Sequence, residues 1–205
     1  MNPKTTRRLQ KWVLGTASLL CLVGAPYWGG LAMAQQNGEL PGIPPQLVAD
    51  YVHAIIEADR TVYSTHVVDP LKEKGILRAG EQWENQNTLP LPAQLLQAAG
   101  RLVAEKGQGI RYRLISLWPI YERNAPATTF ERKGLESMIA NPQQSYSGVI
   151  SSGKLRYFQA IYPDLAVAST CVECHNAHSR SPKRDFQLND VMGGIVITIP
   201  LGNGN

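Results

Sequence analysis

The chain has 205 residues, of which 20 are basic and 16 acidic, giving a net charge of +4 at neutral pH. Four of the basic residues and none of the acidic ones lie in residues 1–34, so the rest of the chain is balanced and offers no cationic surface for nucleic acid. It contains three cysteines, one of them also within 1–34, which excludes a framework of disulfides.

Residues 1–34 have the pattern of an export signal. Four basic residues precede a mostly apolar run, Trp12 to Val23. Ala32-Met33-Ala34 then has the small residues of a cleavage site. We therefore expect a mature start near Gln35 and an exported protein without a stable membrane span. The alternative, a membrane anchor formed by an uncleaved segment, is disfavoured because the apolar run is short and is followed by Pro26.

Residues 35–44 are rich in glycine, proline and polar residues, which predicts a flexible lead-in to a single domain, 45–205. A long helix is expected from about Pro45. Proline restricts the residue before it and has no N–H, so this helix should pause at Asp69-Pro70 and end by Gly75. Its predicted apolar stripe consists of Val48, Val52, Ile55, Val62 and His66.

Two histidines of this helix fall on different faces. His66 lies about 40° from Val52 on a helical wheel and is expected to face the interior. His53 lies in a row with Glu57 and Arg60, which indicates a solvated face. A buried His66 would serve either as a core residue bonded to the backbone or as a metal ligand.

The rest of the chain alternates between helical and extended patterns. We expect helices over 93–106 and 129–140, a strand over 110–118, a hairpin with strands 146–150 and 154–162 around Ser151-Ser152-Gly153, a helix opened by Pro163-Asp164, and a buried last strand, 195–199. The pattern predicts an α+β domain, a mostly antiparallel sheet carrying N-terminal helices.

One pentapeptide carries specific chemistry: Cys171-Val172-Glu173-Cys174-His175. Two cysteines two residues apart and a histidine directly after them form the attachment signature of a c-type haem. On one helical turn the three side chains reach the same small area, so that both thiols can add to haem vinyl groups and His175 can bind the iron as its proximal ligand. The motif predicts one covalently bound haem c. Such attachment occurs outside the cytoplasm, in the periplasm or the thylakoid lumen, which agrees with the export signal.

Three other interpretations compete with haem attachment. A disulfide between Cys171 and Cys174 leaves His175 without a role. A thioredoxin-like redox pair needs a βαβ context that the flanking sequence lacks. A zinc site that adds His178 would crowd four ligands into eight residues. Haem attachment is favoured over all three, and His178 is expected beside the site or at the surface.

The second axial ligand of the iron would decide what the haem does. His66 is the candidate distal ligand, and bis-histidine ligation would favour electron transfer or redox sensing. Met138 and Met192 are alternatives that fit a core role better, and a methionine ligand would raise the potential. A distal side without a protein ligand would admit O₂, NO or CO. The candidate partners of the haem propionates, which otherwise fit a solvated sheet edge, are Arg111, Arg113, Arg123 and Arg156.

Several segments around the pentapeptide resemble a known family. They are Leu89-Pro90-Leu91-Pro92-Ala93, Phe130-Glu131, Ser181-Pro182-Lys183, Asp190-Val191 and Gly193-Gly194. Over about residues 45–201 the chain is similar to single-haem, c-type, PAS-like proteins. These occur as extracytoplasmic sensory parts of bacterial histidine kinases and cyclases, and as free secreted proteins in cyanobacteria.

The resemblance implies a PAS-like sheet whose haem c is held by Cys171, Cys174 and His175. Some relatives use a cysteine from the N-terminal helical region as the other ligand, and the mature chain expected here has none. His66 is then the natural substitute.

Two classes of function remain open on sequence. One is a monohaem electron-transfer or redox protein with a redox partner. The other is a haem-based redox or gas sensor that signals through a separate partner protein, because no kinase or cyclase domain is found in the chain. An enzyme such as a peroxidase is not expected, since no distal histidine–arginine constellation can be identified.

Overall fold

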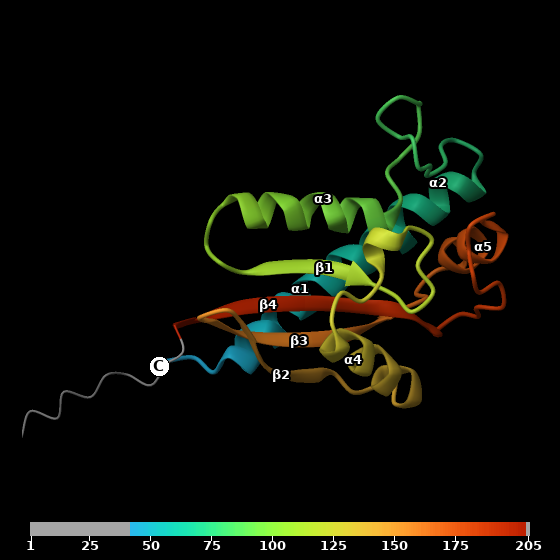
Figure 1. Cartoon of the computed structure of the whole chain (residues 1–205). Helices are drawn as coiled ribbons and strands as arrows, with labels where there is room; N and C mark the ends of the chain where they lie inside the picture. Colours follow the sequence, from blue (N-terminus) through green and yellow to red (C-terminus); the bar gives the residue numbers. More distant parts are fainter. Residues whose placement is uncertain (1–41, 204–205) are drawn as a thin grey trace, which may run out of the picture. The chain divides into compact units, whose positions relative to one another are not determined.

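A four-stranded antiparallel sheet is the centre of the structure, a computed structural model that describes residues 42–203 (Figure 1). Neighbouring strands are antiparallel throughout this sheet. In sheet order the strands are β1 (Arg111–Ile115), β4 (Val191–Asn203), β3 (Leu155–Leu165) and β2 (Tyr146–Ser152). The predicted α+β class with a mostly antiparallel sheet is confirmed, and the arrangement is consistent with the PAS-like fold that the resemblance implied.

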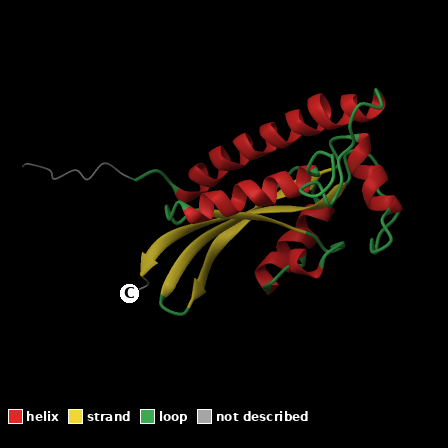
Figure 2. Cartoon of the chain, turned by 90° about the horizontal axis from the view of Figure 1, so that it is seen from above, coloured by secondary structure: helices red, strands yellow, loops and turns green. Residues whose placement is uncertain are grey.

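Helices cover both faces of this sheet (Figure 2). In chain order they are α1 (Pro45–Val62), the π-helical segment η1 (Tyr63–Val68), α2 (Asp69–Glu73), α3 (Pro92–Glu105), the 3₁₀ turn η2 (Glu122–Asn124), α4 (Thr129–Ala140) and α5 (Ser169–Ala177). α1 and α3 pack on one face and α4 on the other. The predicted helices near α3 and α4 are confirmed. So is the hairpin, whose turn contains Gly153 with φ +60°.

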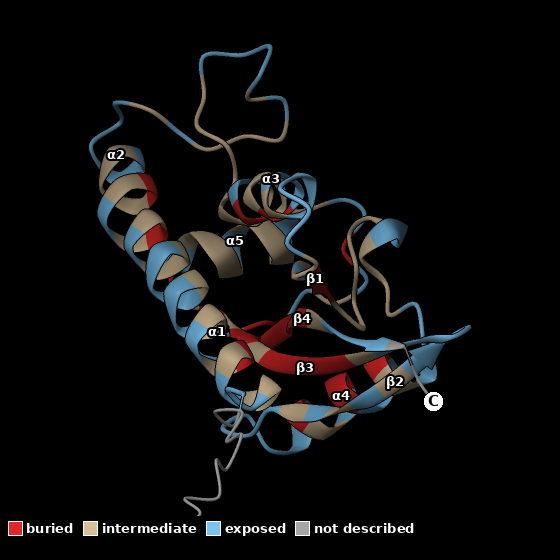
Figure 3. Ribbon diagram, turned by 90° about the vertical axis from the view of Figure 1, so that its left-hand side faces the viewer, coloured by how far each residue is buried: buried red, intermediate tan, exposed pale blue. Residues whose placement is uncertain are grey.

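β4 is a central strand, as its run of β-branched residues predicted. Its residues point alternately into two hydrophobic clusters, one on each face of the sheet. Ile197 packs with Leu96 of α3 on one face, and Val196 packs with Leu135 of α4 on the other. Figure 3 shows the buried residues concentrated in β3 and β4.

The long N-terminal helix passes through Pro70 without the predicted pause. α1 continues into the π-helical segment η1 and then α2, and the Asp69 N–H donates to the Ser64 carbonyl five residues earlier. The Ser64 and Thr65 hydroxyls donate to carbonyls one turn back, at distances of 2.8 Å. Such back-bonding and a wider turn let the chain stay helical up to a proline. The predicted end near Gly75 is confirmed, with φ +63° there.

The predicted buried face of α1 is only partly right, since Val52 packs against the core but other members of the stripe do not. Ile55 and Val62 are 65 and 53% exposed, and His66 is exposed as well. The face that meets the sheet carries Val52 and Ile56, the fully buried Ala49, and also the polar residues His53 and Arg60. The wheel was oriented by apolar residues alone, whereas α1 buries polar side chains whose partners lie on β3.

The expected export signal, 1–34, and most of the expected lead-in lie outside the described residues. Within residues 42–203, no helix combines the length and apolar character that crossing a membrane requires.

Candidate functional site

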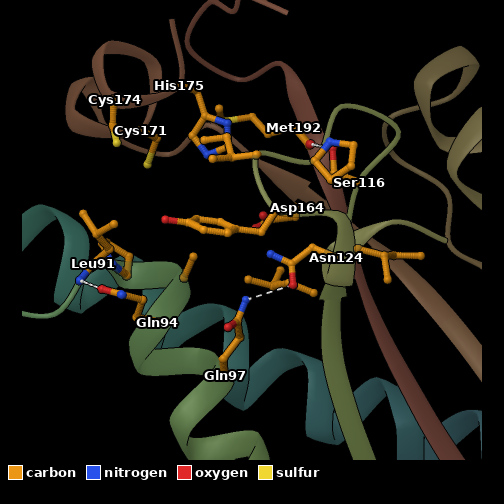
Figure 4. Close-up of a pocket in the computed structure, with 18 of the residues that line it drawn as sticks. Leu91, Gln94, Gln97, Ser116, Asn124, Asp164, Cys171, Cys174, His175 and Met192 are labelled. Carbon is orange, nitrogen blue, oxygen red and sulfur yellow. Dashed lines mark hydrogen bonds between the residues drawn. The ribbon is translucent and has the colours of Figure 1, made fainter. Parts of the chain in front are cut away.

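The helix α5 presents Cys171, Cys174 and His175 on one face. The three occupy positions i, i+3 and i+4 of a nine-residue helix, which places their side chains over neighbouring turns. They line a common cavity, into which Figure 4 shows them pointing. The grouping that the pentapeptide predicted is therefore present in the fold.

The cavity has a volume of about 390 Å³. It lies between α5, the first turns of α3, the segment after β1, and the adjoining ends of β3 and β4. Apolar side chains such as Leu91, Ile115, Trp118 and Ile120 form much of the wall. Small-molecule and cofactor sites usually have about 300–1,000 Å³ and mostly apolar walls, so this cavity is of cofactor size.

Both thiols are available for chemistry. Cys171 and Cys174 are free cysteines, although they lie one helical turn apart. Burial raises the pKa of each thiol above its ordinary value, so both sulfurs carry a proton at neutral pH. A disulfide between them is absent from the structure.

The imidazole of His175 is held neutral. Burial lowers its pKa, and the nearby positive charge of Arg60 lowers it further. The Nδ1 atom is buried and has no hydrogen-bond partner. A neutral ring with an unused nitrogen is what a transition metal requires of a histidine ligand.

Asn176 fixes the wall behind this imidazole. Its side-chain amide donates to the Phe186 carbonyl at 2.9 Å and accepts from the Phe186 N–H at 3.0 Å. The Phe186 ring then meets the His175 ring edge-on, with centroids 5.8 Å apart. The long segment before β4 is thereby tied to α5.

A buried ion pair also lines the cavity. Arg60 Nη1 is 3.0 Å from Asp164 Oδ1, and each side chain is only 10% exposed. Arg60 also donates to the Leu165 carbonyl at 3.3 Å, while its Nε is buried without a partner. Burial raises the pKa of Asp164, and the guanidinium opposes this rise. The prediction that Pro163-Asp164 opens the following helix is wrong, because β3 continues to Leu165 and α5 begins only at Ser169.

Two side-chain contacts join α5 to α2. Asp69 accepts a hydrogen bond from Thr170, and Lys72 forms an ion pair with Glu173. Figure 1 shows the two helices next to each other at one end of the sheet. The helix that carries the cysteines is thus attached to the end of the long N-terminal helix.

A polar cluster surrounds Tyr121, one of the residues that line the cavity. Arg180 and Arg123 lie over its ring, at 4.2 and 5.0 Å from the centroid. His178 Nε2 is 3.1 Å from Glu81 Oε1, and burial and the Glu81 carboxylate raise the pKa of the Tyr121 hydroxyl. His178 therefore lies beside the site, as expected, and is engaged with Glu81.

The structure does not bring His66 to this cavity. The residue is exposed, its Nδ1 lies 2.7 Å from Thr65 Oγ1, and it is not among the residues of the wall. The prediction of a buried His66 is wrong because the face of α1 was misjudged. His53, expected in solvent, instead stacks on Tyr162 with ring centroids 4.0 Å apart and a side chain 14% exposed.

The two methionines occupy core positions. Met138 belongs to the cluster under α4. Met192 lines the cavity, but it packs with Phe186 and Cys171 in the cluster that supports α5.

Of the four arginines proposed for propionates, Arg123 alone lines the cavity. Arg113 pairs with Glu131 at 2.7 Å, and Arg111 and Arg156 are exposed. Arg60, which sequence reasoning assigned to a solvated row, is the buried cation of the site. Its partner is 104 residues away in the chain, so no local pattern could have pointed to it.

Together these features define an α+β protein whose antiparallel sheet supports a Cys-x-x-Cys-His helix over a cofactor-sized cavity. A family model described as Tll0287-like (Tll0287) matches residues 46–200, and the chain belongs to this family. The family resemblance seen in the sequence is confirmed. A solved structure described as the cyanobacterial haem protein Tll0287 is similar to the chain, with 16% identity, a TM-score of 0.47, and coverage of 80% of this chain and 100% of that one. No curated protein matches the sequence.

Proposed function

We propose that the chain binds one haem c in this cavity and has an electron-transfer or other redox function outside the cytoplasm. The observation that carries the proposal is that two free thiols and one neutral imidazole, all from one helix face, line a single cavity of cofactor size. The family adds support, because Tll0287 itself is described as a haem protein.

The residues present fit this group. Each thiol of Cys171 and Cys174 would add across one vinyl double bond, the sulfur bonding to one carbon and the hydrogen going to the other, so the addition needs no oxidant. His175 would bind the iron through its neutral ring. The bound haem would supply a one-electron couple. Apolar side chains form much of the wall, and the buried Arg60–Asp164 pair adds fixed charges to it.

The proposed role requires a second protein. We infer a redox or signalling partner, a location in the periplasm or the thylakoid lumen, and no enzymatic activity of the chain itself. The expected export signal supports the location, because cytochrome-type attachment takes place outside the cytoplasm.

The test compares five variants of the full chain, expressed in a host that exports it and attaches haem. Cys171→Ser and Cys174→Ser should each leave one thioether link, and the double variant should lose haem on denaturation. His175→Ala should keep both thioether links. It should lose the absorption spectrum of an iron that is bound by a histidine. His66→Ala, an exposed histidine of the same chain, is the control and should match wild type. Full haem retention by the double serine variant would refute covalent attachment.

The alternative function, a haem-based sensor of redox state or of a gas, is favoured by one observation. Among the described residues, the cavity wall contains no second histidine. An iron bound by one protein imidazole would be open to an external ligand.

A further inference from the structure

The histidine, cysteine and methionine side chains that could bind iron opposite His175 can be counted. All four histidines of the chain are described, and His53, His66 and His178 lie outside the cavity wall of residues 42–203. In the same part of the chain the cysteines are Cys171 and Cys174, which belong to α5.

The methionines do not change this count. Met138 lies in the core under α4, across the sheet from α1 and α3. Met192 packs into the cluster beneath α5, with Phe186 and Cys171, and so lies on the side of the cavity that already holds His175.

The side of the cavity opposite α5 carries amides instead. Figure 4 shows His175 at one side and the pair Gln97–Asn124 at the other. Gln97 Nε2 donates to Asn124 Oδ1 at 3.3 Å, which leaves the Asn124 Nδ2 group to point elsewhere. Both residues line the cavity.

The two residues stand on held segments of the backbone. The Asn124 N–H donates to the Tyr121 carbonyl, and its own carbonyl accepts from the Ser116 N–H, each at 2.9 Å. Gln97 stands on α3, one turn after Gln94, whose amide is consumed by Leu91 N–H and the Glu81 carbonyl at 3.1 and 2.8 Å. The backbone that carries Asn124 is therefore held on both sides, and the Asn124 Nδ2 group makes no hydrogen bond to the described residues.

Amide groups suit iron poorly as ligands, whereas imidazole and sulfur suit it well. Hydrogen-bond donors and polarity on the distal side of a haem decide whether small molecules bind there.

We propose that the Gln97–Asn124 pair forms a subsite for a small external ligand of the haem iron, a diatomic molecule or anion whose outer atom accepts a hydrogen bond from Asn124. This inference rests on the proposed haem function and deepens it, because it assigns the ligand class and the residues that select it. The hydrogen bond from Asn124 should raise the affinity for a ligand with a strong acceptor atom, such as cyanide. It should raise the affinity for carbon monoxide only slightly.

The test uses the haem-loaded full chain and begins with a measurement of covalent haem, which separates the two proposals. Carbon monoxide should shift the Soret band of the ferrous protein, and cyanide that of the ferric protein. Asn124→Leu removes the donor at similar volume and should weaken cyanide binding roughly fivefold, the effect of one hydrogen bond, while changing carbon monoxide affinity less than about twofold. Asn124→Asp, which replaces the donor with an acceptor, should weaken cyanide binding at least as much. Gln86→Leu, at an exposed amide, is the control.

Three results would overturn the inference. Covalent haem with a six-coordinate spectrum that neither ligand alters would show that a protein side chain occupies both axial positions. Unchanged cyanide affinity in both Asn124 variants would show that the amide faces something else, such as a propionate. Absence of covalent haem would overturn the proposed function and this subsite with it.

Discussion

Replacement of Arg60 by leucine should destabilise the folded protein strongly at neutral pH. The variant leaves the Asp164 carboxylate, 10% exposed, without its cation. Removing one partner of a buried ion pair costs about 3–5 kcal/mol, against about 0–1 kcal/mol for exposed pairs. For a chain of this size each kcal/mol lowers the melting temperature by about 2–4 °C, so the loss should be about 6–20 °C.

The pH dependence identifies the cause. In the variant, burial keeps the pKa of Asp164 above its ordinary value of 3.8 without opposition from the guanidinium. The folded state then holds this proton more tightly than the unfolded state, so stability should be highest near or below that pH and should fall as pH rises towards the folded-state pKa. Melting followed by circular dichroism from pH 4 to 7 measures this trend.

Two further variants make the prediction refutable. Lys72→Leu breaks the pair with Glu173, whose side chain is 60% exposed, and should lower the melting temperature by less than about 4 °C. Adding Asp164→Asn to Arg60→Leu removes the stranded charge and should recover most of the loss. If Arg60→Leu costs no more than Lys72→Leu, or if the second change gives no recovery, the buried pair does not stabilise the fold as predicted.

Three other changes test separate parts of the structure. His53→Phe should make stability between pH 7 and 5 less sensitive to acid, because burial lowers the pKa of this histidine and protonation below pH 6.5 favours the unfolded state; a steeper dependence would contradict this. Asn176→Leu, which removes two hydrogen bonds to the Phe186 backbone, should cost about 1–3 kcal/mol and speed proteolysis of the segment before β4; equal protease resistance would contradict the proposed tie. Gly193→Ala should cost about 1–3 kcal/mol, since an added Cβ would lie 2.3 Å from a backbone oxygen of β1, whereas Gly42→Ala, with no atom within 4 Å, should be neutral in the same urea titration.

Local patterns predicted the sheet and the later helices well. α4 has the predicted bounds. The helical periodicity of its sequence ends at Asn141-Pro142, and Thr128, directly before the helix, caps its first turn. The hairpin followed from a turn with Gly153, and the central position of β4 from its β-branched residues. These features depend on neighbours in sequence.

The errors have a common physical origin. α1 turns His53 and Arg60 inward because Tyr162 and Asp164, more than 100 residues later, provide the stacking surface and the charge. A helical wheel contains neither partner, so it placed His66 inside. The pentapeptide predicted the grouping of its three side chains correctly, because that grouping is contained within about one helical turn.

The most direct test of the account is the intact mass of the purified, exported chain after full denaturation. We predict the mass of the mature polypeptide plus one haem, with none removed by acidic acetone, because two thioether bonds through Cys171 and Cys174 survive unfolding. A denatured chain that has the mass of the polypeptide alone, under conditions in which a known c-type cytochrome matures in the same host, would contradict the central claim.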